Sequence, residues 1–188
     1  MEKEEYLKHA SNLDVPQFRE LMETYGQEVW NFAFLMTKKR DLADDVTQEV
    51  FLKVLQKIGA FRGESSFKTW LFSIARNTSV SMLRSSFFRR VTLVEFIAPS
   101  SGHPSAEEEA MENMFADEIW TQVLKLPGKY REVLLLDGKY ELSVKEIAQI
   151  LGEPEGTVKS KLSRARAKMN ELAREEELRY ERAKDSVV

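Results

Sequence analysis

A stretch near the C-terminus combines small polar side chains with cations at helical spacing. On a helix, Gly156, Ser160 and Ser163 would share one narrow face, and basic residues would flank it. Hydroxyl groups can hydrogen-bond to base edges, and cations can donate to guanine or to phosphates. These residue types at this spacing predict a helix that contacts the major groove of duplex DNA. The contact residues would be Gly156, Thr157, Lys159, Ser160, Ser163 and Arg164. Arg166 and Lys168 lie further round the helix, and we assign them to phosphates or to solvent.

The residues before this helix predict a helix-turn-helix. Ser143 and Glu146 have the spacing of a capping box, which starts a helix. Gly152 can adopt the left-handed conformation that ends it, and Pro154 suits the first turn of the next helix. The apolar stripe that would hold the second helix against a core is Val158, Leu162, Ala165, Met169 and Leu172. The alternative is a plain helical hairpin whose basic face is solvated.

A second candidate surface lies on a helix expected from about residue 41 to residue 58. Its buried face would carry Ala43, Val46, Thr47, Val50, Phe51, Val54 and Ile58. The opposite face carries Asp41, Asp45, Gln48, Leu52 and Gln56, with Glu49 at its edge. A single exposed leucine is ordinary, but Leu52 among carboxylates and amides also fits a docking anchor for another protein. Spacing alone leaves both interpretations open.

The acidic run at residues 44–49 also invites a magnesium interpretation, because an Asp-rich helix can hold a cation and a diphosphate. Such a site needs several converging carboxylates, and no second Asp-rich helix is present in the sequence. His9 and His103 both fall in segments expected to be flexible, which argues against a histidine metal site. The sequence therefore predicts no cofactor and no metal.

A polar loop at residues 61–66 leads into a third helix, expected from residue 67 to residue 84. Basic groups, an amide and aromatic rings near this loop suit single-stranded DNA, whose unstacked bases need a flat partner. The residues assigned to that contact are Arg62, Gly63, Ser65, Ser66, Trp70, Arg76, Asn77 and Arg84. We expect the loop and Asn77 to form a pocket for one base. Trp70 and Phe72 also fit the core, and for Trp70 alone the spacing favours that interpretation.

Composition limits the class of protein. The chain has 188 residues, 43% of them hydrophobic and 31% charged, with only 8 Gly and 5 Pro, which favours an all-α fold. There is no cysteine, no apolar run of transmembrane length and no signal-peptide pattern, so we expect a cytoplasmic protein. The net charge of −3 conceals two basic regions, 62–90 and 157–174, separated by an acidic one. This segregation predicts nucleic-acid contacts on two modules.

The same patterns divide the chain into segments. Residues 13–90 form a first helical module, in which Asp14 and Pro16 start the first helix. Its apolar residues at helical spacing are Phe18, Leu21, Met22, Tyr25, Val29, Phe32, Ala33 and Met36. Residues 91–113 read as a flexible acidic linker, and residues 114–175 as a second module. Residues 176–188 are a charged tail, either a solvated helix end or disordered.

Taken together, these motifs resemble a bacterial extracytoplasmic-function (ECF) sigma factor of the sigma-70 family. The matching segments are 41–51 (DLADDVTQEVF), 61–63 (FRG), 67–71 (FKTWL), 74–77 (IARN), 126–133 (LPGKYREV) and 156–166 (GTVKSKLSRAR). No single segment is decisive, but their order is specific, and the resemblance spans residues 13–175.

The resemblance implies a role for each module. The first would be the sigma-2 domain, whose acidic helix binds core RNA polymerase through Asp41, Asp45, Gln48, Glu49 and Leu52. Its loop and third helix would melt and read the −10 promoter element. The second would be the sigma-4 domain, whose helix-turn-helix reads the −35 element. The protein would be no enzyme and would have no small-molecule substrate, and an anti-sigma factor, often membrane-bound, would hold it inactive. Ser81 departs from the family, since many relatives carry an acid there.

Two other classes remain open at this point. A transcriptional regulator with a sensory helical domain would need a ligand pocket and would bind promoters without polymerase. An all-helical diphosphate-binding enzyme would show magnesium-dependent turnover. A gel shift on promoter DNA with and without core polymerase separates the regulator from a sigma factor.

Overall fold

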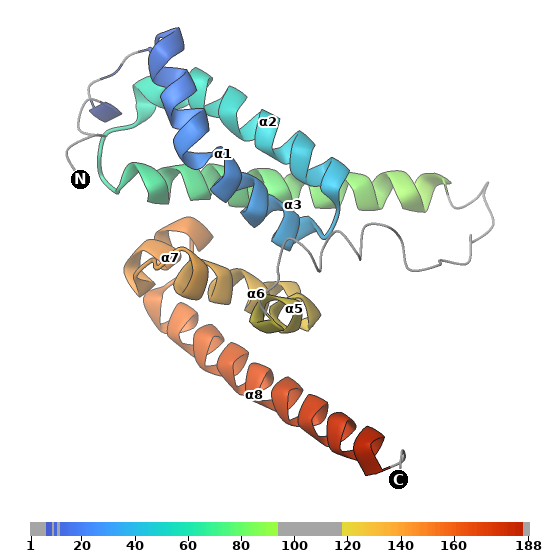
Figure 1. Cartoon of the computed structure of the whole chain (residues 1–188). Coiled ribbons are helices and arrows are strands. Elements are labelled where there is room, and N and C mark those ends of the chain that lie inside the picture. Colours follow the sequence, from blue (N-terminus) through green and yellow to red (C-terminus); the bar gives the residue numbers. More distant parts are fainter. Residues whose placement is uncertain (1–6, 9, 11, 94–117, 186–188) are drawn as a thin grey trace. The chain divides into compact units, whose positions relative to one another are not determined.

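A computed structural model describes residues 7, 8, 10, 12–93 and 118–185 (Figure 1). All the regular structure in this part of the chain is helical, which confirms the all-α prediction. The described chain divides into two compact units, an N-terminal one with α1, α2 and α3 and a C-terminal one with α5 to α8. The predicted linker, residues 91–113, lies almost entirely outside the described residues.

The first two helices form an antiparallel pair. Helix α1 (Val15–Thr37) begins at Asp14, whose carboxylate accepts from the Gln17 amide at 2.8 Å in a reciprocal capping box. It ends at Lys38 in the left-handed conformation, and α2 (Arg40–Lys57) follows at once. The Nε1 group of Trp30 donates to Asp44 Oδ1 at 2.6 Å, so a polar bond links the two helices beside their apolar contact.

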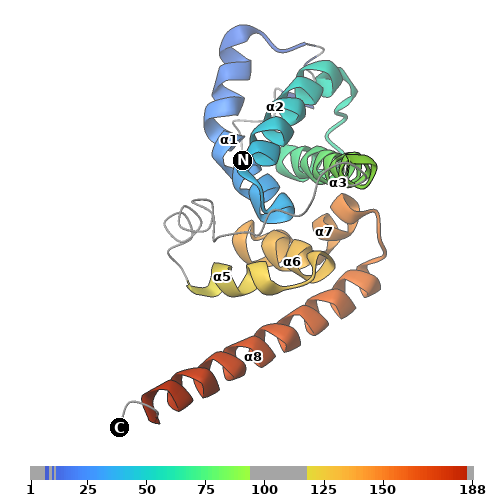
Figure 2. The ribbon, with the colours of Figure 1, turned by 90° about the vertical axis from the view of Figure 1, so that its right-hand side faces the viewer.

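The core of the N-terminal unit lies among α1, α2 and α3, which pack against one another in pairs (Figure 2). The fully buried side chains from these helices include Val29, Phe32, Val46, Val50, Leu71 and Phe72. The rings of Phe32 and Phe72 meet edge to face at 5.3 Å, which confirms Phe72 as a core residue. The prediction that Met22 faces the core is wrong, because its side chain is 45% exposed.

The third helix is longer than its sequence pattern predicted. A 3-10 turn, η2 (Ile58–Ala60), follows α2, and the polar loop then leads into α3 (Phe67–Leu93), nine residues beyond the expected end at residue 84. Ser66 caps α3, since its Oγ accepts from the Thr69 amide at 3.1 Å. The loop at residues 61–66 is therefore held at its two ends, by η2 before it and by the capped start of α3 after it.

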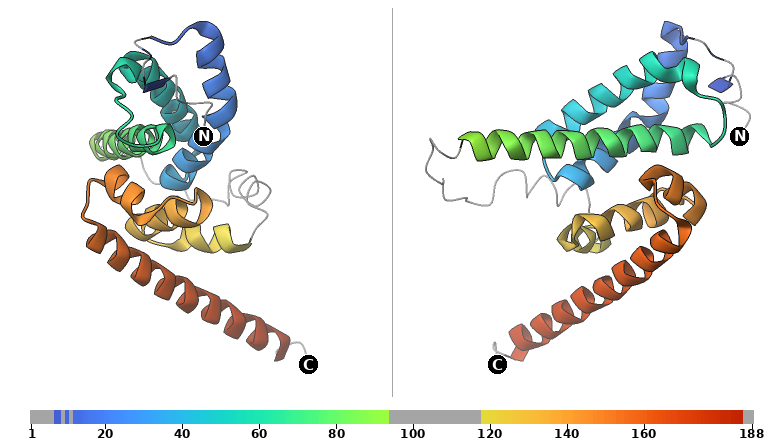
Figure 3. Two further views of the ribbon diagram at one scale, coloured as in Figure 1. Left: turned by 90° about the vertical axis from the view of Figure 1, so that its left-hand side faces the viewer. Right: turned by 180° about the vertical axis from the view of Figure 1, so that it is seen from behind.

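The C-terminal unit contains the predicted helix-turn-helix (Figure 3). Its elements are α5 (Glu118–Lys125), α6 (Gly128–Leu134), the π-helical turn η3 (Leu135–Lys139), α7 (Val144–Leu151) and α8 (Glu155–Asp185). Helix α6 packs against α8, whose Val158, Leu162 and Ala165 are buried as predicted. Residues 176–185 of the charged tail continue α8 as helix.

The caps of the helix-turn-helix are those that the sequence predicted. The Glu146 amide donates to Ser143 Oγ at 3.3 Å and the Ser143 amide donates to Glu146 Oε2 at 3.0 Å, which are the reciprocal bonds of a capping box. Gly152 has φ of +66°, and the amide of Glu153 reaches back to the Ala148 carbonyl at 3.1 Å. Pro154 lies immediately before α8 rather than inside its first turn, because its carbonyl accepts the first helical hydrogen bond.

A buried arginine joins α5 to α6. Arg131 is only 6% exposed, and its Nη1 donates to the carbonyls of Leu124 at 3.1 Å and Leu126 at 3.5 Å. These carbonyls end α5, where the helix leaves acceptors without intrahelical partners. Burial lowers the pKa of the Arg131 guanidinium below its ordinary value, and the charge of Glu132 acts in the opposite direction. The hydrogen bonds from the Arg131 guanidinium to these carbonyls support the junction between α5 and α6.

We predict that Arg131→Met lowers the stability of the C-terminal unit by about 1.5–3 kcal/mol, the typical loss of hydrogen bonds to a charged group. Hydrogen exchange of the α5 and α6 amides in the full chain measures this effect. The matched control is Arg174→Met, which removes an exposed cation from α8. Equal protection of these amides in the two variants would show that Arg131 contributes nothing beyond a surface arginine.

Candidate nucleic-acid and protein interfaces

An aromatic cluster holds both ends of the loop at residues 61–66. Phe61 enters the loop and Phe67 leaves it, and their rings meet edge to face at 5.8 Å. Trp70 contacts both, with ring centroids 5.3 Å from Phe61 and 5.7 Å from Phe67. Tyr25 of α1 adds a ring 5.5 Å from Phe67. Between these packed rings, Arg62, Glu64 and Ser66 are exposed and Ser65 is half-buried.

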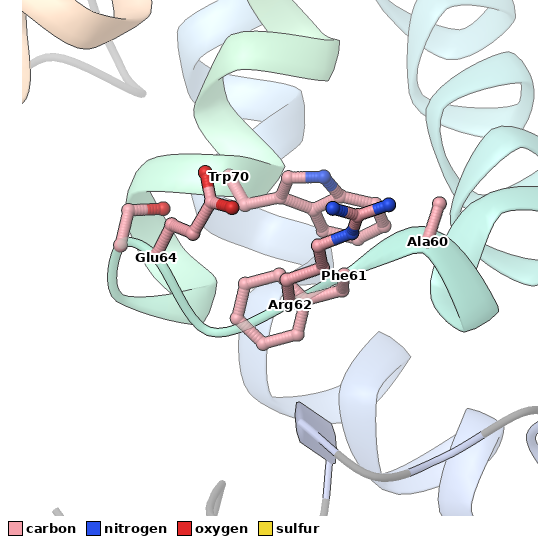
Figure 4. A pocket seen from close by; sticks show the side chains of 6 residues that line it. Ala60, Phe61, Arg62, Glu64 and Trp70 are labelled. Carbon is pink, nitrogen blue, oxygen red and sulfur yellow. The ribbon is translucent and has the colours of Figure 1, made fainter.

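A pocket of about 410 Å³ opens on this loop (Figure 4). It is lined by Ala60, Phe61, Arg62, Glu64, Ser65 and Trp70. The lining offers a flat ring, a guanidinium, a carboxylate and a hydroxyl, which are the groups that bind a nucleobase by stacking and by its polar edge. The volume lies within the range of about 300–1,000 Å³ typical of small-ligand sites.

The structure brings together only part of the predicted single-strand site. Arg62, Ser65 and Trp70 line the pocket, and the half-buried Trp70 both packs on the aromatic cluster and presents a surface to solvent. Asn77 does not line the pocket, against our expectation, because it follows Trp70 by seven residues, a rise of roughly 10 Å along the helix. The Nη1 group of Arg76 donates to Asn77 Oδ1 at 3.3 Å.

The remaining residues of the predicted site have local roles or stay on the surface. Gly63 has φ of +68°, the left-handed conformation that glycine adopts without steric cost. Ser66 uses its hydroxyl to cap α3, so its assignment to DNA competes with a structural role. Arg84 is exposed on α3, about five turns beyond the loop.

The outer face of α2 presents an apolar group in polar surroundings, as the sequence predicted. Asp41, Asp45 and Gln48 are exposed, and the side chain of Leu52 is 52% exposed. Glu49 at the edge of this face pairs with Lys53 at 3.1 Å. Lys53 in turn donates to Thr78 Oγ1 of α3 at 3.1 Å, so the edge of the face is tied to the rest of the unit.

The acidic run of α2 does not gather into a metal site in the described part of the chain. No group of three or more His, Asp or Glu side chains with metal-binding geometry occurs there. Asp44 instead accepts the hydrogen bond from Trp30. Among the described residues, no helix combines the length and apolar character needed to cross a membrane.

On α8, ion pairs divide the cations into two groups. Lys161 pairs with Glu153 of the turn at 2.6 Å, and Arg166 pairs with Asp137 of η3 at 2.8 Å. Lys159 and Arg164 are exposed, beside the exposed small face of the first turns. The predicted DNA-reading residues are thus together on one solvent-facing surface.

Sequence reasoning missed the partners of Lys161 and Arg166. It placed Arg166 further round the helix than the flanking cations and assigned it to phosphates or to solvent. The ion pair of Lys161 spans the turn and has a local signal, a carboxylate eight residues before a lysine. The pair of Arg166 spans 29 residues, and no local pattern indicates it.

Two family models match the chain, one to each unit. The model for sigma-70 region 2 matches residues 21–86, and the model for sigma-70 region 4 matches residues 116–169. Among curated relatives, the RNA polymerase sigma factor YlaC of Bacillus subtilis (strain 168) is 30% identical over 177 residues, which cover 91% of this chain and 99% of YlaC. The ECF RNA polymerase sigma factor SigW of the same organism is 27% identical over 180 residues, covering 90% of this chain and 95% of SigW.

Solved structures agree with these sequence matches. The sigma factor RpoE in complex with the anti-sigma factor NepR, from Bartonella quintana, has a TM-score of 0.67 at 29% identity and covers 85% of this chain and 98% of its own. CnrH in complex with the cytosolic domain of CnrY has a TM-score of 0.65 at 24% identity, covering 89% of this chain and 95% of its own, and supports the fold alone.

The chain belongs to the sigma-70 family and is an ECF sigma factor. It is therefore a transcription initiation factor and not an enzyme. It binds core RNA polymerase and directs it to promoters.

Proposed function

We propose that the two units divide the work of promoter recognition. Residues 13–90 bind core polymerase and read the −10 element as a single strand, and residues 114–175 read the −35 element as duplex. The observation that carries this division is the pocket on the loop at residues 61–66, because a pocket that suits an unstacked base lies on one unit and a major-groove helix on the other. The two surfaces suit different states of DNA.

For polymerase, we assign the outer face of α2. Leu52 supplies an apolar anchor, and the exposed carboxylates around it favour a basic partner surface. Such a face combines the features of a binding hot spot, an apolar group that becomes buried inside a polar rim. The contact residues are Asp41, Asp45, Gln48, Glu49 and Leu52, with Glu49 at the rim through its pair with Lys53.

For the −10 element, one unstacked base of the non-template strand enters the pocket. Its face lies against the indole of Trp70, and its polar edge meets the carboxylate of Glu64 and the hydroxyl of Ser65. Arg62 is exposed at the same loop and neutralises a phosphate. Asn77 and Arg84 contact neighbouring nucleotides along α3, since they lie beyond the pocket.

For the −35 element, the first turns of α8 enter the major groove. Ser160 and Ser163 approach base edges, and Lys159 and Arg164 contact guanine or phosphates at the two flanks. Arg166 stays with Asp137, which orients the helix on its own unit rather than on DNA.

An anti-sigma factor is proposed as the regulatory partner. The support is the similarity to the Bartonella quintana sigma factor, whose structure holds an anti-sigma factor. We propose that the protein acts in the cytoplasm, with polymerase, and that its anti-sigma factor can tether it to the membrane. Cell fractionation tests the tether: the protein should leave the membrane fraction when the anti-sigma factor is removed.

We predict that Leu52→Ala weakens binding to core polymerase by ~2 kcal/mol, because it removes the apolar anchor. Asp45→Lys should weaken it as well, through the reversed charge. Fluorescence anisotropy with labelled protein measures both affinities. Leu178→Ala, an exposed leucine on α8, is the matched control. Wild-type affinity in both α2 variants, with the fold intact, would mean that polymerase binds elsewhere.

We predict that Arg62→Ala and Asn77→Ala impair open-complex formation more than initial duplex binding, because both residues would meet DNA only after the strands separate. Permanganate footprinting of the −10 region reports opening, and a gel shift of the closed complex reports binding. Arg62→Ala should also reduce the salt slope of opening by about one, as a lost phosphate contact does. Equal losses in both steps would contradict the assignment to single-stranded DNA.

We predict different outcomes for two arginines on α8. Arg164→Ala should cost ~1–3 kcal/mol and relax the preference at one base pair if it reads guanine, or weaken all promoters alike if it binds phosphate. Arg166→Ala should leave base preference unchanged, since its partner is Asp137. Selection of a −35 library with variants at Lys159, Ser160, Arg164 and Arg166 separates these results. Unchanged preference in the first three variants would exclude α8 as the sequence reader.

A further inference from the structure

Lys8, in a short turn ahead of α1, lies against the loop that carries the pocket. Leu7 is fully buried, and the carbonyl of Leu7 accepts from the Ala10 amide at 3.4 Å, which closes a short turn. A methyl group placed on Gly63 would lie 2.8 Å from both Cγ and Cδ of Lys8. The hydrocarbon stem of Lys8 therefore runs across the Cα atom of Gly63. In Figures 1 and 3 the short dark-blue turn lies beside the loop that enters α3.

We propose that Leu7 and Lys8 are positioning residues for the −10 pocket: Leu7 anchors the segment, and the stem of Lys8 covers Gly63 and holds the loop open. This inference rests on the proposed role of the loop in reading the −10 element. It extends the reading site to a segment more than 50 residues away in the sequence, which neither family match includes.

The middle of the loop is the part that needs support from another segment. Phe61 and Phe67 fix its two ends, but Gly63 has no side chain with which to pack. Its φ of +68° is one of many conformations open to glycine, so the free loop would sample others. A side chain laid over Gly63 from outside restricts that sampling. Lysine suits the task, because its four-carbon apolar stem can pack along a backbone.

Two substitutions separate the contribution of the Lys8 stem to opening from that of its charge. Lys8→Met keeps a long apolar stem and removes the ammonium, whereas Lys8→Ala removes both. We expect Lys8→Ala and Leu7→Ala to slow open-complex formation by holoenzyme about two- to tenfold. This range corresponds to the cost of ordering one additional flexible element when DNA binds. Lys8→Met should open promoters like wild type. Lys184→Ala, an exposed lysine at the end of α8, is the control.

The readout must separate positioning from general destabilisation. We would place 2-aminopurine at successive non-template positions of the −10 element and follow its fluorescence as holoenzyme opens the promoter. Lys8→Ala should reduce the change at the position whose base enters the pocket, with core-polymerase affinity and thermal unfolding as in wild type. A uniform loss at every position, or equal losses in Lys8→Met and Lys8→Ala, would overturn the proposal.

A double-mutant cycle tests the contact itself. Gly63→Ala adds a methyl group that meets the Lys8 stem, and it also strains the backbone at positive φ. In the Lys8→Ala background the stem is absent, so only the backbone strain remains. The loss of opening caused by Gly63→Ala should therefore be smaller in that background, and additive losses would show that the two residues do not interact.

The same series distinguishes failure of the positioning role from failure of the pocket. If Arg62→Ala impairs opening while Lys8→Ala and Leu7→Ala do not, the loop reads the −10 element but Leu7 and Lys8 do not position it. If none of the three variants affects opening, both the assignment of the loop to the −10 element and the positioning role of Leu7 and Lys8 are wrong.

Discussion

Reading a separated DNA strand requires a loop that keeps its shape while its polar groups face water. In the loop that we propose for this role, the aromatic contact among Phe61, Phe67 and Trp70 meets that requirement at the two ends, and the stem of Lys8 lies over Gly63 in the middle. The rings join the exit of α2 to the start of α3, and Tyr25 ties them to α1. Phe61 and Phe67 are buried at the two ends of the loop, and Arg62, Glu64 and Ser66 are exposed between them. The pocket opens on this part of the loop.

The proposed role of α8 sets a different requirement for the C-terminal unit, since a helix that reads DNA must carry cations without binding every anion it meets. Ion pairs take part of the positive charge into the unit itself: Lys161 with Glu153 and Arg166 with Asp137. The first pair is half-buried and the second lies at the surface, and surface pairs contribute little to stability. Each pair occupies a cation that would otherwise be available to a phosphate. Lys159 and Arg164 then remain on the surface that would meet DNA.

Features with a local cause could be predicted from the sequence. The capping boxes at Asp14 and Ser143, the left-handed Gly152 and the exposed Leu52 all follow from spacing within a few residues. Contacts between distant segments could not. Asp137 with Arg166 and Lys8 with Gly63 depend on how separate elements meet, and no periodicity encodes that. Asn77 failed as a pocket residue because its distance along α3 outweighs its chemical suitability for a base.

The central claim is that the two units of this sigma factor contact different forms of DNA, and site-specific photocrosslinking tests it most directly. A benzophenone amino acid would replace Ser65 in the pocket or Ser160 on α8, and holoenzyme would be irradiated on one promoter. We predict that the probe at Ser65 crosslinks only the non-template strand of the −10 element, and only after opening. The probe at Ser160 should crosslink the −35 duplex before and after opening. Crosslinks from both positions to the same element, or from Ser65 to closed duplex, would contradict the account.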